Sequence, residues 1–499
     1  MDQIHTGCLM DITIRQKDAV NLFIECEKSV AKELNQYFTF YVPNYQYTPA
    51  YKKKIWDGQI RLFNLYSRNI YVGLLDYIKK FAEDRKYSIE IDSEKLLESE
   101  DYTIEEFSEF VKSLKLKLKP HPHQLKACYR AMKDKRCLLL SPTGSGKSLI
   151  IYMLVRDAIM RLNDNEKVLI IVPTVGLVTQ LYKDFEDYSA GTWDVSTNVH
   201  TIFSGAEKQT AKKIVVSTWQ SLYNMPKQFF DQFGAVFGDE CHLFKAKSLT
   251  SIMTNLTDAH YRIGTTGTLD GTQTHKLVIE GLFGPVFNVT STKKLIEKKL
   301  LTDVEIECLI LDYDAKVKND MKRTAYQDEL NFIITSKTRN KFIRDLTLNL
   351  KGNSLLLFNF VDLHGKVLHA MIKEKAPDRN VFFIYGGTDA DQRENIRNIL
   401  TDEENAILIA SYGTCSTGIN IPSIANVIFS SPSKSVIRVL QSIGRGLRKS
   451  EGKGKTKVYD ISDDLSHKSY TNHTMRHLDE RLRIYTNEKF SYTLKRIKV

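Results

Sequence analysis

Short runs of apolar residues alternate with longer amphipathic stretches along most of the chain, beginning near residue 103. Such short runs, bounded by polar residues, are typical of buried strands, and the stretches between them, such as 148–160, have helical spacing. The first series of predicted strands is 137–140, 168–172, 214–217, 235–238 and 262–265. The second series is 304–312, 354–360, 381–385, 406–410, 427–430 and 457–461. This alternation predicts two tandem α/β units, each with a parallel sheet wound with helices.

The residues before 92 follow a different pattern. Strand-like runs at 19–25, 59–65 and 87–91 are mixed with helical spacing at 29–38 and 73–82. This mixture predicts a small mixed α/β unit at the N-terminus. The following segment, 92–101, is acidic and has no apolar period, so we place a linker there. Three domains are therefore predicted, with bounds 1–100, 101–290 and 291–499.

Composition excludes several classes of protein. The longest uninterrupted aliphatic run, Val168–Val172, is far shorter than the ~20 residues that span a bilayer. The first residues lack the basic and apolar segments of a secretory signal. Seven cysteines are scattered without a Cys-x-x-Cys pair, which disfavours a disulfide framework or a structural zinc site and favours a reducing compartment. We therefore expect a cytoplasmic protein with no membrane segment.

The positive charge is concentrated near the C-terminus. The formal net charge is +11, and residues 434–499 carry 16 Lys and Arg against 7 Asp and Glu, which gives +9 for that segment. A basic excess in one segment favours a polyanionic partner such as nucleic acid. A solvated basic face is the alternative explanation of the same charges.

A glycine-rich segment, Ser141–Ser148 (S-P-T-G-S-G-K-S), lies between a predicted strand and a predicted helix. This is the context of a phosphate-binding loop, in which Gly144 and Gly146 let backbone N–H groups surround an anion at a helix N-terminus. Thr143 and Ser145 complete the loop, Lys147 is placed to contact the β- and γ-phosphates, and Ser148 to bind Mg²⁺. Ser141 replaces the first glycine of the strict pattern. The alternative is a glycine-rich turn that only caps a helix.

A pair of carboxylates follows the predicted strand 235–238, in the segment Asp239-Glu-Cys-His242. Phosphoryl transfer needs a carboxylate on the metal ion and a group that orients the attacking water. Asp239 and Glu240 supply these two functions, and His242 lies two residues further along. An exposed acidic pair without chemistry is the alternative.

Two arginines lie three residues apart in the segment Gln441–Arg448 (Q-S-I-G-R-G-L-R) of the second α/β unit. Residues three apart share one face of a helix. Arg445 and Arg448 are therefore candidates for an arginine finger, which stabilises charge on the γ-phosphate. A basic helix that covers a core is the alternative.

In this order, the three segments resemble motifs I, II and VI of the superfamily 2 helicases and translocases. Other segments resemble further motifs of that family: 121–124, 172–180, 217–221, 264–268, 355–360 and 411–420. The resemblance implies two RecA-like domains with ATP bound between them. It implies catalytic roles for Lys147, Asp239, Glu240, His242, Gln441, Arg445 and Arg448, and places His242 against Thr266 and Thr268.

The resemblance also assigns binding residues. It implies that Gln124 contacts adenine and that Thr174, Thr218, Thr417 and Gly418 meet the nucleic-acid backbone. Gly418 and Asn420 join the nucleotide-binding set, although Asn420 replaces an Asp that many relatives carry. ATP and Mg²⁺ are the implied cofactors.

A narrower resemblance is to the recombination helicases of T-even-type phages, carried by Trp56–Leu62, by Asp239–His242 and by Tyr326–Glu329 with Arg339. It implies a monomeric ATP-dependent helicase in the host-cell cytoplasm that unwinds branched DNA, migrates junctions and removes RNA–DNA loops. The alternatives are an RNA helicase, a double-strand translocase that does not separate strands, and a nucleic-acid clamp that does not hydrolyse ATP.

Two basic segments remain without a motif. Lys52–Lys54 with Arg61 and Arg68 form a candidate DNA-binding patch at the N-terminus. In the C-terminal tail, basic and aromatic residues are interleaved, a pattern that suits phosphate contact and base stacking. The tail candidates are Arg476, Arg481, Arg483, Lys495, Arg496 and Lys498 with Tyr485, Phe490 and Tyr492. If they face solvent, neutralising Arg481, Arg483, Lys495 and Arg496 leaves stability nearly unchanged. In the same segment, the helical spacing of Met475, Leu478, Leu482 and Tyr485 predicts an apolar stripe that packs on a core.

Overall fold

The computed structural model describes residues 10–92, 102–203, 205–244, 247–269, 273–416, 424–431 and 455–499. Contacts divide the chain into two compact units, residues 1–141 with 146–289 and residues 142–145 with 290–499. Six predicted site residues, Thr417, Gly418, Asn420, Gln441, Arg445 and Arg448, lie outside the described residues. Within the described ranges, no helix is long and apolar enough to cross a membrane.

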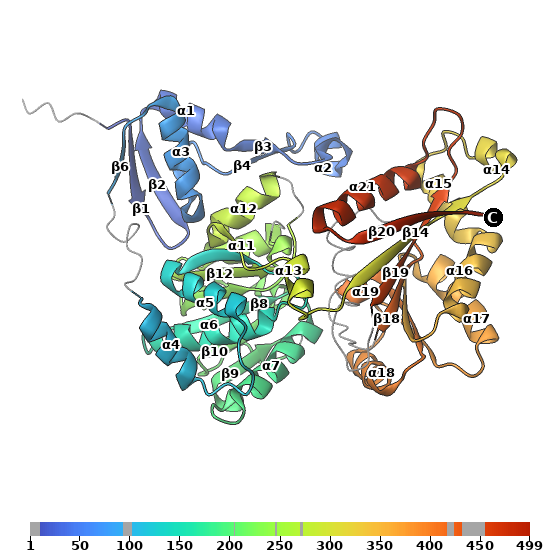
Figure 1. Cartoon of the computed structure of the whole chain (residues 1–499). Helices are drawn as coiled ribbons and strands as arrows, with labels where there is room; N and C mark the ends of the chain where they lie inside the picture. The colour runs from blue at the N-terminus through green and yellow to red at the C-terminus, as the bar shows by residue number, and fades with distance from the viewer. Residues whose placement is uncertain are drawn as a thin grey trace, which may run out of the picture. The chain divides into compact units, whose positions relative to one another are not determined.

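The N-terminal part of the first unit is a mixed four-stranded sheet in the order β5-β2-β1-β6 (Figure 1). Its strands are β1 (Ile12–Gln16), β2 (Asn21–Cys26), β5 (Asn69–Tyr71) and β6 (Ile89–Ile91), and its helices are α1 (Lys28–Tyr37) and α3 (Leu75–Arg85). A two-stranded arm, β3 (Thr39–Tyr41) with β4 (Gln59–Arg61), carries α2 (Pro49–Lys52). The predicted strand 59–65 is therefore shorter than expected, because the chain turns after Arg61.

The rest of the first unit is a seven-stranded parallel sheet in the order β13-β7-β12-β11-β8-β10-β9. Its strands are β7 (Arg136–Leu140), β8 (Lys167–Val172), β9 (Val199–Ile202), β10 (Ile214–Thr218), β11 (Phe233–Gly238), β12 (Tyr261–Thr266) and β13 (Val286–Asn288). Its helices are α4 (Ile104–Ser113), α5 (Pro122–Asp134), α6 (Lys147–Arg161), α7 (Val175–Ser189), α8 (Val195–Asn198), α9 (Trp219–Leu222), α10 (Lys227–Phe230), α11 (Lys247–Asn255) and α12 (Gln273–Phe283). All five predicted strands are present, and the two edge strands β9 and β13 were not predicted.

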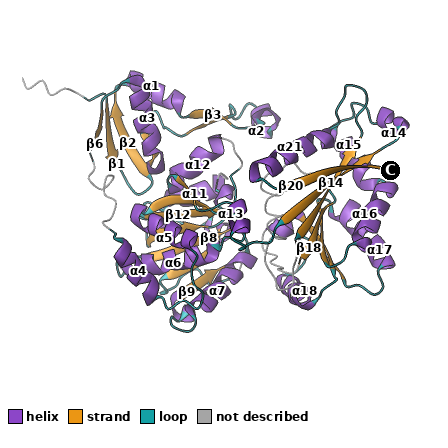
Figure 2. Ribbon diagram, viewed as in Figure 1, coloured by secondary structure: helices purple, strands orange, loops and turns teal. Residues whose placement is uncertain are grey.

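The second unit is another seven-stranded parallel sheet, in the order β16-β17-β15-β18-β19-β14-β20. Its strands are β14 (Val304–Asp312), β15 (Asn353–Phe358), β16 (Val381–Ile384), β17 (Ile407–Ser411), β18 (Ile424–Phe429), β19 (Thr456–Asp464) and β20 (Ser491–Lys498). Its helices are α13 (Thr292–Glu297), α14 (Ala315–Asp320), α15 (Tyr326–Thr335), α16 (Lys337–Asn349), α17 (Lys366–Lys375), α18 (Ala390–Asp402), α19 (Tyr412–Ser416) and α21 (His473–Glu488). Figure 2 shows helices packed along the strands of each unit. The predicted α/β fold class, with two tandem parallel sheets and a small mixed N-terminal sheet, is confirmed.

The basic C-terminal tail is part of this second fold rather than a free extension. Helix α21 packs on β19, and β20 pairs in parallel with β14 at the sheet edge. Arg481 is buried, and its guanidinium donates to both carboxylate oxygens of Asp460 at 2.8 Å and to the Ser462 hydroxyl at 2.7 Å. Tyr485 is also buried and donates to the same carboxylate at 2.9 Å. The predicted DNA contacts of Arg481 and Tyr485 are therefore wrong, because both side chains are held inside the fold.

The remaining tail residues differ in exposure. Arg483, Lys495, Arg496 and Lys498 are exposed, whereas Phe490 is buried. Lys495 forms an ion pair with Glu307 at 2.7 Å, and Arg496 pairs with Asp464 at 2.5 Å. The two cations are more than half exposed, whereas the Glu307 and Asp464 side chains are 16% and 9% exposed, so salt screens the cation end of each pair. These basic groups therefore stay available to an anionic partner.

A second buried polar cluster lies near the ends of β18 and β19. Arg339 is fully buried and donates to Asp463 and to the Ser430 carbonyl, both at 2.8 Å. His364 is also buried, with its Nδ1 atom 3.1 Å from the Ser431 hydroxyl. Burial, and then the nearby Arg339 charge, lower the pKa of His364 to about 3. His364 is therefore neutral in the folded protein at physiological pH.

Candidate functional site

The loop between β7 and α6 has the backbone of a phosphate-binding loop. Gly144 and Gly146 both have φ near +80°, at 82° and 81°, a conformation that side chains disfavour. The Ser141 backbone N–H donates to the Thr266 carbonyl at 2.8 Å, which fixes the loop to the neighbouring strand β12. Ser141 is buried, so a serine is accommodated where the strict pattern has glycine. The loop ends at the N-terminus of α6, where orphan N–H groups favour an anion.

Three predicted nucleotide ligands surround this loop. The Lys147 ammonium lies 3.4 Å from the Ser141 carbonyl oxygen, across the loop. The Ser148 hydroxyl lies 2.8 Å from the Tyr188 hydroxyl of α7. The Gln124 amide donates to the Gly146 carbonyl at 3.4 Å, and its oxygen accepts from the His121 N–H at 2.7 Å. Gln124 thus touches the loop directly and caps α5 at the same time.

The acidic pair stands at the carboxyl end of β11, which is buried along its whole length. The Asp239 carboxylate accepts hydrogen bonds from the Glu240 N–H at 2.9 Å and from the Thr265 hydroxyl at 2.7 Å. Burial, and then the neighbouring Glu240 charge, raise the pKa of Asp239 above its ordinary value. Glu240 itself adopts a left-handed conformation, with φ at 51° and ψ at 48°. This backbone turn points two successive carboxylates in different directions.

The loop and the acidic pair meet at this edge of the sheet. The Lys147 ammonium lies 4.0 Å from one Glu240 carboxylate oxygen, and the other oxygen lies 3.3 Å from His242 Nδ1. The same nitrogen lies 3.1 Å from the Thr266 hydroxyl, which donates to the Thr268 carbonyl at 3.0 Å. A continuous polar chain therefore runs from Lys147 through Glu240 and His242 to the segment 264–268.

Cys241 occupies a space that two glycines create. A Cβ atom added to Gly238 would lie 2.8 Å from the Cys241 sulfur, and one added to Gly264 would lie 2.7 Å from it. Both distances are too short for real atoms, so β11 and β12 need glycine at these points. The thiol donates to the Gly238 carbonyl at 3.2 Å. Cys241 is thus a packing residue under the acidic pair.

Two predicted nucleic-acid contacts lie at the same edge of the sheet, on neighbouring strands. Thr174 follows β8 and caps α7, where its hydroxyl accepts from the Leu177 N–H at 3.4 Å. Thr218 ends β10, and the parallel register pairs it with Val172 of β8. Its hydroxyl lies 3.1 Å from that of Ser221. The structure brings these two threonines to one edge but leaves Thr218 largely buried.

Two contacts in the site were not predicted from the sequence. Thr265 binds Asp239, whereas the resemblance emphasised Thr266 and Thr268. Tyr188 binds the Ser148 hydroxyl from 40 residues away. Register explains Thr265, because Gly264 pairs with Gly238 and the residues that follow them are opposite one another. The contact between Thr265 and Asp239 can therefore be predicted from the sequence only once the order of the strands is known.

Comparison with known proteins places this site in a family. Three family models match: "DNA helicase UvsW, N-terminal" over residues 11–92, "Type III restriction enzyme, res subunit" over 117–271 and "Helicase conserved C-terminal domain" over 338–450. The ATP-dependent DNA helicase uvsW of Enterobacteria phage T4 is 32% identical over 510 residues, which cover 98% of this chain and all of that protein. The chain belongs to the UvsW family of ATP-dependent DNA helicases.

Solved structures agree with this assignment. The crystal structure of T4 UvsW matches this UvsW-family chain with a TM-score of 0.53 and 30% identity, over 98% of this chain and 100% of that one. Among curated proteins, a second sequence relative, the DNA 3'-5' translocase XPB2 of Sulfurisphaera tokodaii, is 24% identical over 74% of this chain and 87% of its own length. This UvsW-family protein is therefore an ATP-dependent DNA helicase, and it hydrolyses ATP to act on DNA.

Proposed function

We propose that this helicase unwinds branched DNA, using Mg²⁺-bound ATP at the edge of the first parallel sheet. The observation that carries the proposal is the convergence of Lys147, Asp239 and Glu240 at that edge, with Lys147 and Glu240 4.0 Å apart. These residues come from two separate strand ends, and they are the groups that phosphoryl transfer requires. Branched DNA is proposed because junction migration and RNA–DNA loop removal follow from the resemblance to phage recombination helicases.

The residue roles are those that the family resemblance implies, and the contacts of the described residues support them. Lys147 binds the β- and γ-phosphates, with the backbone of Thr143, Gly144, Ser145 and Gly146 around them. Glu240 orients the attacking water. His242 couples the ATP site to the segment 264–268 through its Nδ1 atom, which lies 3.1 Å from the Thr266 hydroxyl. Gln124 contacts the adenine from its place beside Gly146. Of the residues outside the described ranges, Gln441, Arg445 and Arg448 act on the γ-phosphate, Asn420 and Gly418 contact the nucleotide, and Gly418 with Thr417 contacts the DNA.

The residues present fit a magnesium ion. Asp239 offers a buried carboxylate whose pKa is raised by burial and then by the neighbouring Glu240 charge, more than the Lys147 ammonium lowers it, so a bound cation suits this position. Ser148 offers a hydroxyl at the start of α6, and hard oxygen donors of this kind suit Mg²⁺ together with phosphate oxygens. When bound, the ion neutralises charge that develops on the transferred phosphate. Asp239 and Ser148 are therefore the proposed protein ligands.

DNA contact is proposed for two places in the first unit. Thr174 contacts the sugar–phosphate backbone at the sheet edge, and the contact of Thr218, which is 4% exposed, rests on the family resemblance alone. The arm formed by β3, α2 and β4 adds three exposed lysines, Lys52–Lys54, and a highly exposed tyrosine, Tyr47. Basic and aromatic side chains together suit phosphates and unstacked bases. Arg68, predicted to join this patch, instead donates to the carbonyl and sulfur of Cys26 at 3.3 and 3.2 Å.

The proposal has four further parts. It includes domains with bounds 1–100, 101–290 and 291–499, a monomeric state, action on RNA–DNA hybrids and a place in the host cytoplasm. The last two rest on the resemblance to the phage recombination helicases alone. A monomer suffices because the proposed catalytic residues all belong to one chain.

The test compares nucleic acids as activators of ATP hydrolysis by the purified full chain. Forked DNA and four-way junctions are expected to stimulate turnover more than linear DNA duplex or RNA duplex at equal concentration of nucleotides. Stronger stimulation by RNA duplex favours the RNA-helicase alternative. Equal stimulation by linear duplex, without strand displacement, favours the double-strand translocase.

The variant Glu240→Gln separates binding from chemistry in the same assay. It keeps the side-chain size and removes the charge, so it is expected to bind an ATP analogue and forked DNA normally. Its turnover should fall by about 100-fold or more, the usual contribution of a positioned acid or base. Asp231→Asn, an exposed acid after α10, is the control. Wild-type turnover in Glu240→Gln would contradict the assigned role.

A further inference from the structure

The N-terminal sheet shares one hydrophobic core with the first parallel sheet. Buried residues of β1, β2 and α3 form a single cluster with residues of α11 and α12. Such continuity is unlike a flexible interdomain contact, which is small and more polar. The two parts of the first unit are therefore joined by a packed interior.

Two glycines, Gly73 and Gly281, let the two parts approach closely. A Cβ on Gly73 would overlap the Glu280 carbonyl oxygen, so the segment before α3 lies directly on the backbone of α12. A Cβ on Gly281 would lie 3.1 Å from the Tyr71 Cβ. Backbone contact of this kind leaves no room for sliding without unpacking.

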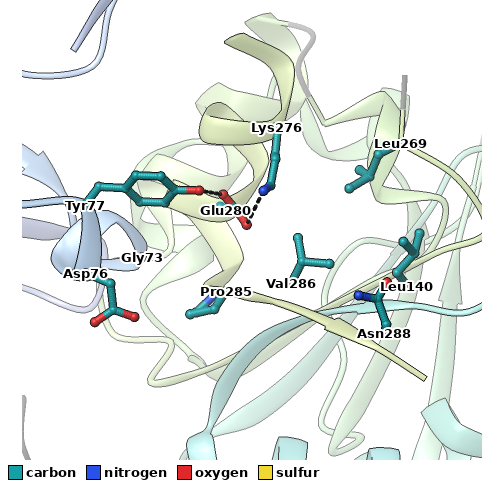
Figure 3. Close-up of a pocket in the computed structure, with 10 residues that line it drawn as sticks. All are labelled: Gly73, Asp76, Tyr77, Leu140, Leu269, Lys276, Glu280, Pro285, Val286 and Asn288. Atoms are coloured by element: carbon teal, nitrogen blue, oxygen red, sulfur yellow. Dashed lines mark hydrogen bonds and ion pairs between the residues drawn. The ribbon is translucent and has the colours of Figure 1, made fainter. Parts of the chain in front are cut away.

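Polar contacts fasten the same surface (Figure 3). The Tyr77 hydroxyl donates to the Glu280 carboxylate at 2.6 Å, and Lys276 lies 3.8 Å from the other carboxylate oxygen. Glu280 is only 4% exposed, so these two partners satisfy a carboxylate that water reaches poorly. A pocket of about 500 Å³ adjoins them, and Leu140 and Leu269 line it. These leucines stand directly before the phosphate loop and after the segment 264–268.

A buried arginine connects this surface to the strand that carries Thr265 and Thr266. Arg262 of β12 is fully buried and donates to the carbonyls of Leu282, Leu256 and Met253 at 2.8, 2.9 and 2.8 Å. It therefore ties α11 and α12 to β12. The Ala19 N–H adds a hydrogen bond to the Thr257 carbonyl at 2.9 Å from the N-terminal sheet.

We infer that Glu280 is a positioning residue for DNA-driven ATP hydrolysis, because it fastens the N-terminal domain to α12 so that both move with the first parallel sheet as one body. The inference rests on the proposed function for its DNA contacts. DNA held by the N-terminal arm then acts on the site through Tyr77, Glu280, α12 and β12. Among the described residues, the N-terminal sheet and the first parallel sheet meet through packed contacts and not through a hinge.

A reversible cross-link tests the rigid connection. Tyr71→Cys with Gly281→Cys places two Cβ atoms near 3.1 Å, close to the 3.5–4.5 Å of disulfides. The oxidised protein is expected to unwind forked DNA within about twofold of the same protein after reduction. A tenfold loss on oxidation that reductant restores would show that the N-terminal domain must move, and would overturn the inference. Wild-type protein, oxidised in parallel, controls for the native cysteines.

A pair of matched tyrosine variants tests the fastening itself. Tyr77→Phe removes the hydrogen bond to Glu280, while Tyr87→Phe removes an equivalent bond to Glu33, at 3.1 Å, inside the N-terminal domain. We expect Tyr77→Phe to lower the forked-DNA-stimulated kcat several-fold with the KM for ATP and the DNA-free rate unchanged. Glu280→Gln keeps an acceptor for Tyr77 and should retain most of the stimulation. Tyr87→Phe should match wild type.

The outcomes separate this inference from the proposed function. Equal stimulation in Tyr77→Phe and Tyr87→Phe, with both folded by circular dichroism, overturns the positioning role of Glu280. Failure of forked DNA to stimulate the wild type overturns the proposed function instead. In that case, the cross-linked variant is assayed with the nucleic acid that stimulates best. The ratio of its oxidised to its reduced activity then decides whether the N-terminal domain moves.

Discussion

Replacing Arg481 by Gln is expected to destabilise the second unit strongly. The change removes a guanidinium that makes three hydrogen bonds, two to Asp460 and one to Ser462. Burial lowers the pKa of Arg481, but the charge and hydrogen bonds of Asp460 raise it by more, so the group stays charged. The substitution therefore leaves a buried carboxylate without its cation.

The magnitude follows from the burial of both partners. The side chains of Arg481 and Asp460 are 2% and 0% exposed. Removing one partner of such a pair costs about 3–5 kcal/mol, because the other charge stays buried. For a fold of this size, that loss lowers the melting temperature by on the order of 10 °C. Tyr485 keeps its hydrogen bond to Asp460 and offsets a small part of the loss.

The assay can separate the two units. The three tryptophans, Trp56, Trp193 and Trp219, all belong to the first unit. In Arg481→Gln, the urea transition seen by far-ultraviolet circular dichroism should gain an early phase, while the tryptophan fluorescence transition stays in place. Arg483→Gln, an exposed arginine on the same helix, should change neither. A shift of less than about 1 kcal/mol in Arg481→Gln would refute the argument from burial.

Three further outcomes are expected. Lys147→Ala should abolish ATP turnover with an unchanged circular dichroism spectrum, and wild-type turnover would show that the loop does not bind phosphate. The folded pKa of His364 is about 3 and its unfolded value is ~6.5, so below pH 6.5 the unfolded chain binds a proton that the folded protein does not. The free energy of unfolding therefore falls as pH falls, and His364→Leu should lose about 2 kcal/mol less of it than wild type between pH 7 and pH 5. Neutralising Arg483, Lys495 and Lys498 to Gln should leave stability nearly unchanged and lower the slope of log affinity for DNA against log salt by ~0.7–0.9 per lost contact, whereas an unchanged slope would make the tail a solvated face.

The strand positions could be predicted because buried parallel strands are short apolar runs separated by helices. The central strands β7, β8, β10, β11 and β12 each begin and end within about two residues of the predicted bounds. The edge strands β9, β13 and β20 lack this pattern, whereas the edge strand β16 has it. All but one residue of β20 is exposed, so its alternation carries no burial signal, and pairing with β14 supplies its structure.

The error at Arg481 has a physical explanation. The predicted apolar stripe of α21 is real, and Arg481 lies three residues after Leu478 and four before Tyr485, which places it on the same face. A basic residue inside an apolar stripe indicates a buried partner, and Asp460 inside the apolar strand β19 is the matching signal. Charge counting alone could not distinguish this arginine from the exposed Arg483.

The phosphate loop and the acidic pair could be predicted because each needs only a local sequence context. Their meeting depends on strand order, which places β12 between β7 and β11. The sequence does not determine that order locally, so the Thr265 contact to Asp239 required the structure.

The tight packing around Cys241 also affects the chemical reactivity of its thiol. Burial, and then the Asp239 charge, raise the pKa of this thiol well above its ordinary value, so almost none of it is thiolate, the reactive form. Oxidants and alkylating agents therefore find no nucleophile beneath the acidic pair, even though a sulfur atom lies one residue from Glu240. Alanine would fit at this position without a clash, whereas a side chain larger than cysteine would press on Gly238 and Gly264, which already lie close to the sulfur. The position therefore accepts the loss of the sulfur atom but not a larger side chain.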